Sequence, residues 1–302
     1  MILVTGASGF IGQNLINYIL LNTNESVLAV TRYLDNKNSS ERVEWVSWDM
    51  LEQTTDRMFS TSYYLSEPAH KPDNEELQIE LEIANEYREK FLRFLTKNST
   101  RSLVYLSSSN VMGTSLSPSC NEDSQPQPVT RMAIYKLETE AKFQEFCESR
   151  SFSCVVLRSS LVYGQEPKGN LLILSKLVSK IRVVPFKANT NKRRLISVES
   201  LCELMIHIIS RKNTGHEMFL VSDDIEYNTS DILNYYQRLS NQKVLYIPLP
   251  VALFKIFLKM LGKSKLYDSL FGNYQFDCSK LYRLSGWKPS HPTMQSFFSN
   301  SA

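Results

Sequence analysis

Three glycines near the start of the chain are spaced to bind a phosphate. The segment ILVTGASGFIG places Gly6, Gly9 and Gly12 directly after an apolar run and directly before a segment of helical period. Glycines here allow a tight turn and a close approach of the backbone to a pyrophosphate, and the N–H groups of the helix N-terminus attract the anion. A strand before the motif and a helix after it are the context that such a loop requires. The segment predicts a dinucleotide-binding loop.

The end of the next apolar strand bears on which dinucleotide binds. In NAD-binding proteins of this type, an acidic residue there accepts hydrogen bonds from the ribose hydroxyls. Here Thr31 and Arg32 occupy that region, and Asp35 comes later. A cation suits the 2′-phosphate of NADPH; the alternative is a surface arginine on a loop. We therefore expect NADPH, with NADH as the alternative, and we expect Asp49 to hold the adenine edge.

Further motifs run through the rest of the chain. The glycine-rich loop is followed, in order, by YLSSSNVMG, LRSSLVYG, RRLISVESL, FLVSDD and FDCSKLYRLSGWKP. This ordered series resembles the extended short-chain dehydrogenase/reductase family, in particular its nucleotide-sugar epimerases and 4-ketoreductases of bacterial polysaccharide assembly. The resemblance implies an α/β fold, with a Rossmann doubly wound parallel sheet and a smaller C-terminal substrate-binding lobe.

The resemblance also assigns residues to a reaction in which a hydride passes between a nicotinamide ring and a sugar carbon. Ser108, in SSSNVMG, is expected to hydrogen-bond the sugar oxygen, and Lys136, in YKLETE, to hold the nicotinamide ribose. In the family, a tyrosine one helical turn before the lysine supplies the proton, with its pKa lowered by the lysine and the cofactor. This chain has Met132 at that position. Tyr135 adjoins the lysine and points about 100 degrees around the helix, so we interpret it as a packing residue.

A second departure follows the fourth predicted strand, where many relatives read HLAA and this chain reads YLSEPAH. The change places Glu67 on the nicotinamide side of the expected pocket. Glu67 is then a substitute acid or a ligand of a sugar hydroxyl. The alternative is that Glu67 and His70 are exposed loop residues.

Two arginines fit the pyrophosphate clamp that the resemblance implies. Arg193, in RRLISV, and Arg283, in SKLYRLSGW, carry guanidinium forks that match diphosphate oxygens in geometry and charge. Arg194 alternatively pairs with a local carboxylate. Asn110 is assigned to the substrate, and so is Asn170, for which a helix N-cap is the alternative. The complete set expected to bind the cofactor is Gly6, Ser8, Gly9, Phe10, Ile11, Gly12, Arg32, Asp49, Met50, Leu65 and Lys136.

Three functions remain open at this point. The first is NADPH-dependent reduction of the 4-keto group of a nucleotide-linked 4-keto-6-deoxyhexose, with dTDP-4-dehydro-6-deoxyglucose, reduced to dTDP-fucose, as the leading substrate. The second is a nucleotide-sugar 4-epimerase, and the third is a non-catalytic dinucleotide-binding sensor or scaffold. Reduction needs a proton in one direction only, whereas an epimerase removes and returns it, so Met132 favours the reductase. The retained Ser108 and Lys136 count against the sensor.

The elements that must position these residues follow from the hydrophobic pattern. Short apolar runs alternate with segments of helical period, which predicts βαβ units and a parallel sheet. Expected strands are Ile2–Thr5, Ser26–Thr31, Val43–Ser47, Ser62–Leu65, Ser102–Ser107, Ser153–Arg158, Arg194–Ser197 and Glu217–Val221. Expected helices are Phe10–Leu21, Glu75–Lys97, Val129–Arg150, Leu171–Ile181, Val198–Arg211 and Thr229–Ser240. We expect a dinucleotide-binding domain over 1–163, with returning elements at about 192–222, and a substrate-binding lobe over 164–191 and 223–302.

Composition narrows the possible partners. A net charge of +3 on 302 residues, without a long Lys/Arg block, argues against a nucleic-acid partner. The five cysteines are scattered without metal-ligand spacing, so we expect no metal. The apolar stretch PVALFKIFLKMLGK is interrupted by Lys255 and Lys259 and is too short to span a bilayer, so we expect a packed amphipathic helix and no membrane insertion, with a peripheral membrane helix as the alternative. We expect a soluble, cytoplasmic protein; the resemblance implies a homodimer through the helices at 75–97 and 129–150.

Overall fold

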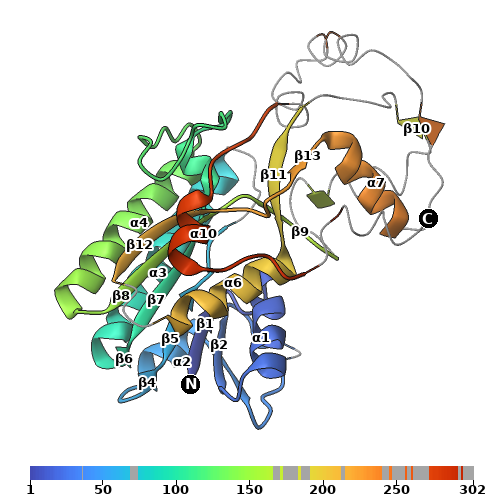
Figure 1. Cartoon of the computed structure of the whole chain (residues 1–302). Helices are drawn as coiled ribbons and strands as arrows, with labels where there is room; N and C mark the ends of the chain where they lie inside the picture. Colours follow the sequence, from blue (N-terminus) through green and yellow to red (C-terminus); the bar gives the residue numbers. More distant parts are fainter. Residues whose placement is uncertain are drawn as a thin grey trace.

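A parallel sheet of seven strands lies at the centre of the protein (Figure 1). The computed structural model describes residues 1–35, 37–68, 74–165, 171–172, 183–184, 191–211, 215–239, 245–246, 256, 260, 272–291 and 294. The strand order is β12 (His216–Val221), β8 (Ser153–Ser159), β7 (Ser102–Ser108), β5 (Thr61–Tyr64), β1 (Ile2–Thr5), β2 (Val27–Thr31) and β3 (Val43–Ser47). Because all neighbours pair in parallel, the carboxyl ends of the strands meet at one edge, where ligands bind in sheets of this kind.

Helices cover both faces of this sheet (Figure 1). One face is covered by α1 (Phe10–Asn22) and α6 (Val198–Ser210), and the other by α2 (Trp48–Gln53), α3 (Glu75–Lys97) and α4 (Arg131–Arg150). Alternate residues of each strand therefore enter separate cores: Val104 packs with the α1 and α6 cluster, and Tyr105 with the α3 and α4 cluster. The fold is α/β with a Rossmann-like sheet, as predicted from the sequence.

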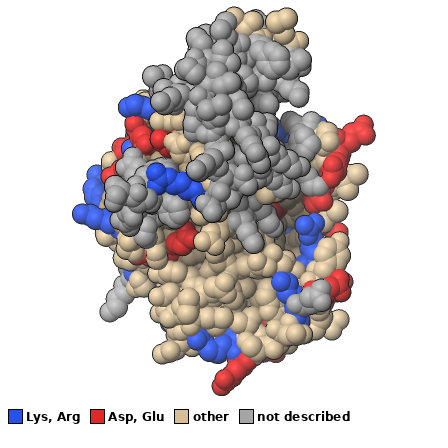
Figure 2. Space-filling view, turned by 90° about the vertical axis from the view of Figure 1, so that its right-hand side faces the viewer, with Lys and Arg blue, Asp and Glu red and all other residues tan. Residues whose placement is uncertain are grey.

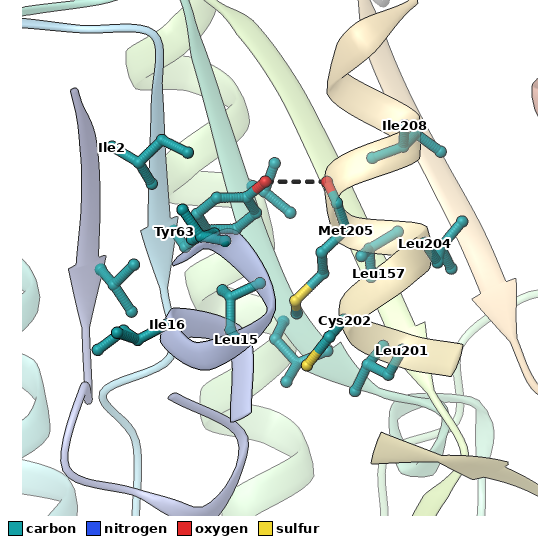
Figure 3. Packing of buried hydrophobic residues seen from close by; sticks show 14 of the residues in the cluster. Ile2, Leu15, Ile16, Tyr63, Leu157, Leu201, Cys202, Leu204, Met205 and Ile208 are labelled. Carbon is teal, nitrogen blue, oxygen red and sulfur yellow. Dashed lines mark hydrogen bonds between the residues drawn. The ribbon is translucent and has the colours of Figure 1, made fainter. Parts of the chain in front are cut away.

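The core between the sheet, α1 and α6 joins distant parts of the chain (Figure 3). The fully buried Tyr63 of β5 reaches α6, where its hydroxyl donates a hydrogen bond of 2.9 Å to the carbonyl oxygen of Met205. Around it pack apolar side chains of α1, such as Leu15, and of α6, such as Leu201. The bond satisfies a phenol that would otherwise be buried without a partner, and it fixes α6 against the sheet.

Side-chain caps fix where the helices around the site begin. Thr130 caps α4, accepting a hydrogen bond of 3.2 Å from the amide of Ala133, and Asn74 caps α3 in the same way through Leu77. Such caps satisfy amides that have no partner inside the helix. By contrast, Gly9 precedes α1 without a side-chain hydrogen bond. The first-turn amides of α1 are thus not capped by the side chain of the preceding residue.

Smaller elements surround the sheet. β9 (Leu161–Tyr163), β11 (Arg193–Ser197) and β13 (Glu226–Tyr227) form a three-stranded sheet, beside α7 (Thr229–Leu239). The remaining short elements are β4 (Met58–Phe59), β6 (Ser99–Thr100), the 3₁₀ helix η1 (Ser109–Met112), β10 (Val183–Val184), β14 (Leu245–Tyr246) and α10 (Ser279–Ser285). The predicted helix Leu171–Ile181 lies mostly outside the described residues, and the division into two lobes remains a prediction.

Charged side chains of both signs lie around the face that Figure 2 shows. The lower central part of this face is formed mostly by uncharged residues, with lysines or arginines and acidic residues interspersed at its rim. No helix within the described part of the chain has both the length and the apolar character that crossing a membrane requires.

Candidate active site

The glycine-rich loop leaves a cradle of bare backbone at the carboxyl end of β1. Gly6 has a φ of +64°, and a Cβ there would lie 2.5 Å from the carbonyl oxygen of Leu65. A Cβ at Gly12 would collide with the backbone of the same loop. Only glycine fits these two positions, and α1 begins directly after Gly9 without a side-chain cap. These features fit the pyrophosphate of a nicotinamide dinucleotide.

The other predicted cofactor residues follow the strands that neighbour this loop. The exposed Ser8 accepts a hydrogen bond of 2.9 Å from Thr31 at the end of β2. Phe10 and Ile11 are half-buried against the core, and the amide of Leu65 donates to Thr5 at 3.1 Å. The structure therefore brings the predicted residues after β1, β2 and β5 together at one edge of the sheet.

The two charged residues expected near the adenosine part of the cofactor form ion pairs with residues of α3. Arg32 forms an ion pair of 3.3 Å with Glu80 of α3. Asp49, in the first turn of α2, pairs with Lys90 of α3 at 3.0 Å, and its neighbour Met50 is exposed. A carboxylate thus stands beside the arginine on which the NADPH expectation rests.

Ser108 and Lys136 meet at the carboxyl end of β7. Ser108 is the last residue of the strand, half-buried, and its Oγ accepts a hydrogen bond of 3.2 Å from the amide of Asn110. Lys136 extends from α4, and its Nζ donates to the carbonyl oxygen of Leu106 at 3.4 Å. Because Leu106 precedes Ser108 by two residues, the ammonium lies beside the end of the strand that carries the serine.

Glu67 is the closest charged partner of that lysine. Its Oε2 accepts a charge-assisted hydrogen bond from Lys136 Nζ, and its Oε1 accepts one of 2.5 Å from the hydroxyl of Tyr105. The Glu67 side chain is only 5% exposed, so the alternative interpretation as an exposed loop residue is wrong. Burial, and then the nearby carboxylate, raise the pKa of Tyr105 well above its usual value. The phenol is therefore a donor that holds Glu67 in place.

Met132 and Tyr135 lie against α3. Met132 is half-buried and packs on a cluster formed by Leu77, Leu81, Ala84 and Tyr135. Tyr135 is 7% exposed, and the guanidinium of Arg88 lies 5.1 Å from its ring centre. Burial raises its pKa as well. The prediction that Tyr135 is a packing residue and not a displaced catalyst agrees with this placement.

A second ion pair lies one helical turn further along α4, and the sequence analysis missed it. Arg158 of β8 donates to both carboxylate oxygens of Glu140, at distances of 2.7 to 3.1 Å. The hydroxyl of Ser107 adds a bond of 2.5 Å to the same carboxylate. Two signals were available: Glu140 follows Lys136 by four residues, and Arg158 directly follows the apolar run Cys154–Leu157 within a strand. This pair ties α4 to β7 and β8 beneath the predicted site.

The predicted substrate residues are only partly brought together. Arg193 begins β11, where it forms a backbone bridge with Tyr274, and burial lowers the pKa of its guanidinium. The hydroxyl of Tyr274 donates to Asn110 Oδ1 at 3.0 Å, which links Arg193 to the loop after Ser108. Arg194 pairs instead with Asp224 at 3.2 Å, as the alternative interpretation expects.

Other predicted residues stand apart from this group. Arg283 is exposed on α10, and no contact joins it to Arg193 among the described residues. Asn170 and His70 lie outside the described residues, so their predicted roles stay open. Of the two arginines in the predicted pyrophosphate clamp, Arg193 is the one that the described residues connect to the loop after Ser108.

A shallow hollow lies away from this site, between α3 and α4. It has a volume of about 380 Å³ and an open, mixed lining. Its lining residues are Gln78, Leu81, Glu82, Asn85, Arg131, Ile134, Tyr135 and Glu138. The hollow contains none of the predicted site residues, so it belongs to the outer surface of the helix pair.

Known proteins resemble this chain over nearly its whole length. The sequence model described as the NAD dependent epimerase/dehydratase family matches residues 2–222. UDP-glucose 4-epimerase of Vibrio cholerae is 28% identical, with 100% of this chain and 94% of the relative aligned. N-acetyl-alpha-D-glucosaminyl-diphospho-ditrans,octacis-undecaprenol 4-epimerase of Escherichia coli O157:H7 is 21% identical over 93% and 88%. The solved UDP-glucuronic acid 4-epimerase of Bacillus cereus, in complex with UDP-glucuronic acid and NAD, has a TM-score of 0.74 at 18% identity, covering 98% of this chain and 96% of that one.

Proposed function

Since the chain belongs to the NAD dependent epimerase/dehydratase family, we propose that it is a nucleotide-sugar 4-epimerase. The observation that carries this proposal is the position of Lys136, whose ammonium lies 3.4 Å from the carbonyl oxygen of Leu106, at the carboxyl end of β7 beside Ser108. The glycine cradle lies at the carboxyl end of β1 in the same sheet. A bound nicotinamide dinucleotide supplies the hydride acceptor and donor that the reaction needs.

The chain's own residues take distinct roles in this proposal. Ser108 hydrogen-bonds the oxygen on carbon 4 of the sugar, and Lys136 holds the nicotinamide ribose and adds positive charge beside the reacting oxygen. Arg193, linked to Asn110 through Tyr274, binds the pyrophosphate of the nucleotide sugar. The loop from Gly6 to Gly12 holds the dinucleotide, because its bare backbone and the N-terminus of α1 suit a pyrophosphate.

The cofactor that we propose is NAD, in place of the NADPH expected from Arg32 alone. The carboxylate of Glu80 lies 3.3 Å from the Arg32 guanidinium, where it would repel a 2′-phosphate. The related Bacillus cereus epimerase was solved with NAD. Calorimetric titration should give an affinity for NAD at least about tenfold above that for NADP⁺, or about 1.4 kcal/mol. The reverse order would restore the NADPH expectation.

The 4-epimerase is preferred over the reductase because both sequence relatives described above are 4-epimerases by name. The second candidate remains reduction of a nucleotide-linked 4-keto-6-deoxyhexose such as dTDP-4-dehydro-6-deoxyglucose, and Met132 is the observation that favours it. A protein without the usual proton donor would then need to supply a proton in one direction only.

The deciding experiment is a product analysis with purified protein. UDP-glucose, UDP-N-acetylglucosamine and UDP-glucuronic acid are each incubated with the protein and NAD, and the 4-epimers are separated by chromatography and identified by NMR. We expect one of these pairs to interconvert without net change in NADH absorbance. Net oxidation of NADPH with dTDP-4-dehydro-6-deoxyglucose, and no epimerisation, would establish the reductase instead. NAD binding without either reaction would leave only the sensor.

A homodimer through α3 and α4 is part of the proposal. Ile79 and Ile134 are 59% and 43% exposed on these helices, and the hollow between them is lined by both apolar and charged groups. Exposed apolar side chains on neighbouring helices favour burial against a second copy. Sedimentation should give twice the chain mass of 34.8 kDa, and Ile134→Glu should shift it toward the monomer. The matched change Leu21→Glu, at an exposed leucine of α1, should leave the mass unaltered.

A further inference from the structure

The proposed reacting centre contains an ion pair where the family resemblance implies a tyrosine and a lysine. Met132 occupies the tyrosine position, but its side chain packs on the α3 cluster of Leu77, Leu81 and Ala84. Glu67, from the loop after β5, places its carboxylate against the Lys136 ammonium. A negative oxygen therefore lies next to the lysine, and it comes from a different element of the fold.

We propose that Lys136 and Glu67 form a proton relay that takes over from the missing tyrosine, an inference that rests on the proposed 4-epimerase function. Lys136 is the catalytic residue, which exchanges a proton with the oxygen on carbon 4 of the sugar. Glu67 is a positioning residue behind it, which holds the ammonium and stores the proton while the sugar is a ketone.

Relative exposure sets the order of the two groups. The Lys136 side chain is 15% exposed and that of Glu67 is 5% exposed, so the lysine is the outer member of the pair. The inner member is held from behind by the Tyr105 hydroxyl, which is fully buried and donates to the second carboxylate oxygen. An ammonium has three N–H groups, so Lys136 can keep its bond to Glu67 while donating to a ligand.

The step balances in atoms and charge. Lys136 first gives one of its protons to Glu67, which leaves a neutral amine whose lone pair can accept a proton. When carbon 4 is then oxidised, its C–H bond breaks and the hydride reduces the nicotinamide ring, while the hydroxyl proton passes to the Lys136 amine. Over the whole step one O–H bond breaks at the sugar and one forms at the carboxyl group. The ring loses one positive charge and Glu67 loses one negative charge, so the net charge of the site stays constant.

This relay suits an epimerase better than a reductase. In an epimerase the stored proton returns to the same sugar oxygen when the hydride returns to the opposite face of carbon 4. No proton from solution is consumed in the cycle. A reductase must instead take up a new proton from solution in each turnover, because the proton that the pair gives to the ketone oxygen leaves with the product. The difficulty that Met132 creates for an epimerase is thereby removed.

A double-mutant cycle between Glu67 and Met132 tests the relay. Glu67→Gln keeps the size and hydrogen-bonding capacity of the side chain but removes the charge and the stored proton. In the native background it should lower kcat by about 10²–10³-fold, with KM for the nucleotide sugar changed less than about threefold. Met132→Tyr restores the family donor, so in that background Glu67→Gln should cost less than about tenfold. Tyr105→Phe, which removes one neutral hydrogen bond to the carboxylate, should lower kcat less than about tenfold.

Two readouts without turnover accompany the cycle. Calorimetric affinity for NAD and the thermal midpoint of unfolding show whether Glu67→Gln keeps the cofactor site and the fold. We expect the NAD affinity to stay within about threefold, because Glu67 contacts Lys136 and Tyr105 and not the glycine cradle.

Distinct outcomes overturn the two proposals. An equal loss of kcat from Glu67→Gln in both backgrounds would show that Glu67 is only structural, and this would overturn the relay while epimerase activity of the native chain stands. Full activity of Glu67→Gln in the native background would do the same. Absence of sugar turnover by the native chain would overturn the proposed function and, with it, the relay.

Discussion

Two ion pairs lie one helical turn apart on α4, and they differ in exposure and in how much of their hydrogen-bonding capacity is taken up. We call Arg158–Glu140 the inner pair and Lys136–Glu67 the outer pair. Arg158 and Glu140 are 5% and 8% exposed, and the guanidinium donates three hydrogen bonds to the carboxylate. Lys136 is 15% exposed and pairs with one oxygen of Glu67. In the described part of the chain, two of the three N–H groups of Lys136 are accounted for, by Glu67 and Leu106.

The difference separates a structural pair from a reactive one. Arg158 and Glu140 join β8 to α4, and Ser107 and the sulfur of Met112 take up further bonding capacity. Groups satisfied in this way fix a geometry but have little left to offer a ligand. Lys136 keeps a donor at the edge of the sheet, on a helix whose position the inner pair sets. The inner pair thereby supports the precision that the outer pair needs.

Removal of Lys136, the cation of the outer pair, should have the largest effect on turnover. Lys136→Met keeps the aliphatic stem but removes every donor beside the reacting oxygen, so turnover should fall by about 10²–10⁴-fold. The measurement is the initial rate of 4-epimerisation per folded protein, with folding checked by circular dichroism because Glu67 loses its partner. The control is Lys142→Met, which removes an exposed lysine of α4 that pairs with Glu89 of α3 and should leave the rate unchanged. Turnover above one tenth of the native rate would contradict a reactive role.

Removal of Glu140, the anion of the inner pair, should reduce stability and not reactivity. Glu140→Gln leaves Arg158 buried without a charged partner, which should lower the free energy of unfolding by about 3–5 kcal/mol. Urea denaturation measures this loss, and Glu138→Gln, at an exposed glutamate of α4, is the control. A loss of turnover by the fraction that remains folded, with stability intact, would reverse the assignment of the two pairs.

A third buried carboxylate, Asp223, has no cation partner among the described residues and sharpens the comparison. Asp223 accepts hydrogen bonds from the Tyr163 hydroxyl at 2.9 Å and the Ser197 amide at 3.1 Å, and burial raises its pKa from 3.8 to about 6. Between these two values the folded protein keeps a proton that the unfolded chain has released, so stability falls as pH rises from about 4 to about 6. Above that pH window the full loss of stability from burying the ionised carboxylate is present.

Asp223→Asn should remove this pH dependence. Because asparagine does not titrate, the variant should gain stability relative to the native chain as pH rises from 4 to 7.5. The gain should amount to about 3 kcal/mol, for a pKa difference of roughly two. Thermal unfolding of both proteins at the two pH values measures it. A difference that stays constant with pH would mean that Asp223 has no raised pKa in the folded protein.

The sequence predicted regular elements better than side-chain pairing. Residues 75–97 were predicted as a helix with the observed bounds of α3, since Leu77, Leu81, Ala84 and Phe91 recur at helical spacing. The short α2 and α10, of six and seven residues, were missed because they contain less than two full periods.

Long-range pairs left no local pattern to read. Glu67 and Lys136 are separated by 69 positions, and no residue pattern near Glu67 indicates that it pairs with this lysine. A charged residue on an amphipathic helix such as Glu140 looks the same in sequence whether it faces solvent or an arginine. The position of Met132 could be predicted, because it precedes Lys136 by one helical turn. The same helical geometry predicted that Tyr135 is a packing residue, and Tyr135 is buried.

The smallest expected effect comes from restoring the family residue. Met132→Tyr should keep the rate of 4-epimerisation or raise it by less than about tenfold, because the relay already carries the proton and a phenol adds a second path beside it. The side chain must leave the α3 cluster, so the unfolding free energy should fall by roughly 1 kcal/mol. Met132→Leu, which keeps an apolar side chain of similar volume, is the control for packing alone. If Met132→Tyr abolishes turnover while Met132→Leu does not, the phenol obstructs the space that the substrate occupies, and the pocket has been rebuilt around the Glu67–Lys136 pair.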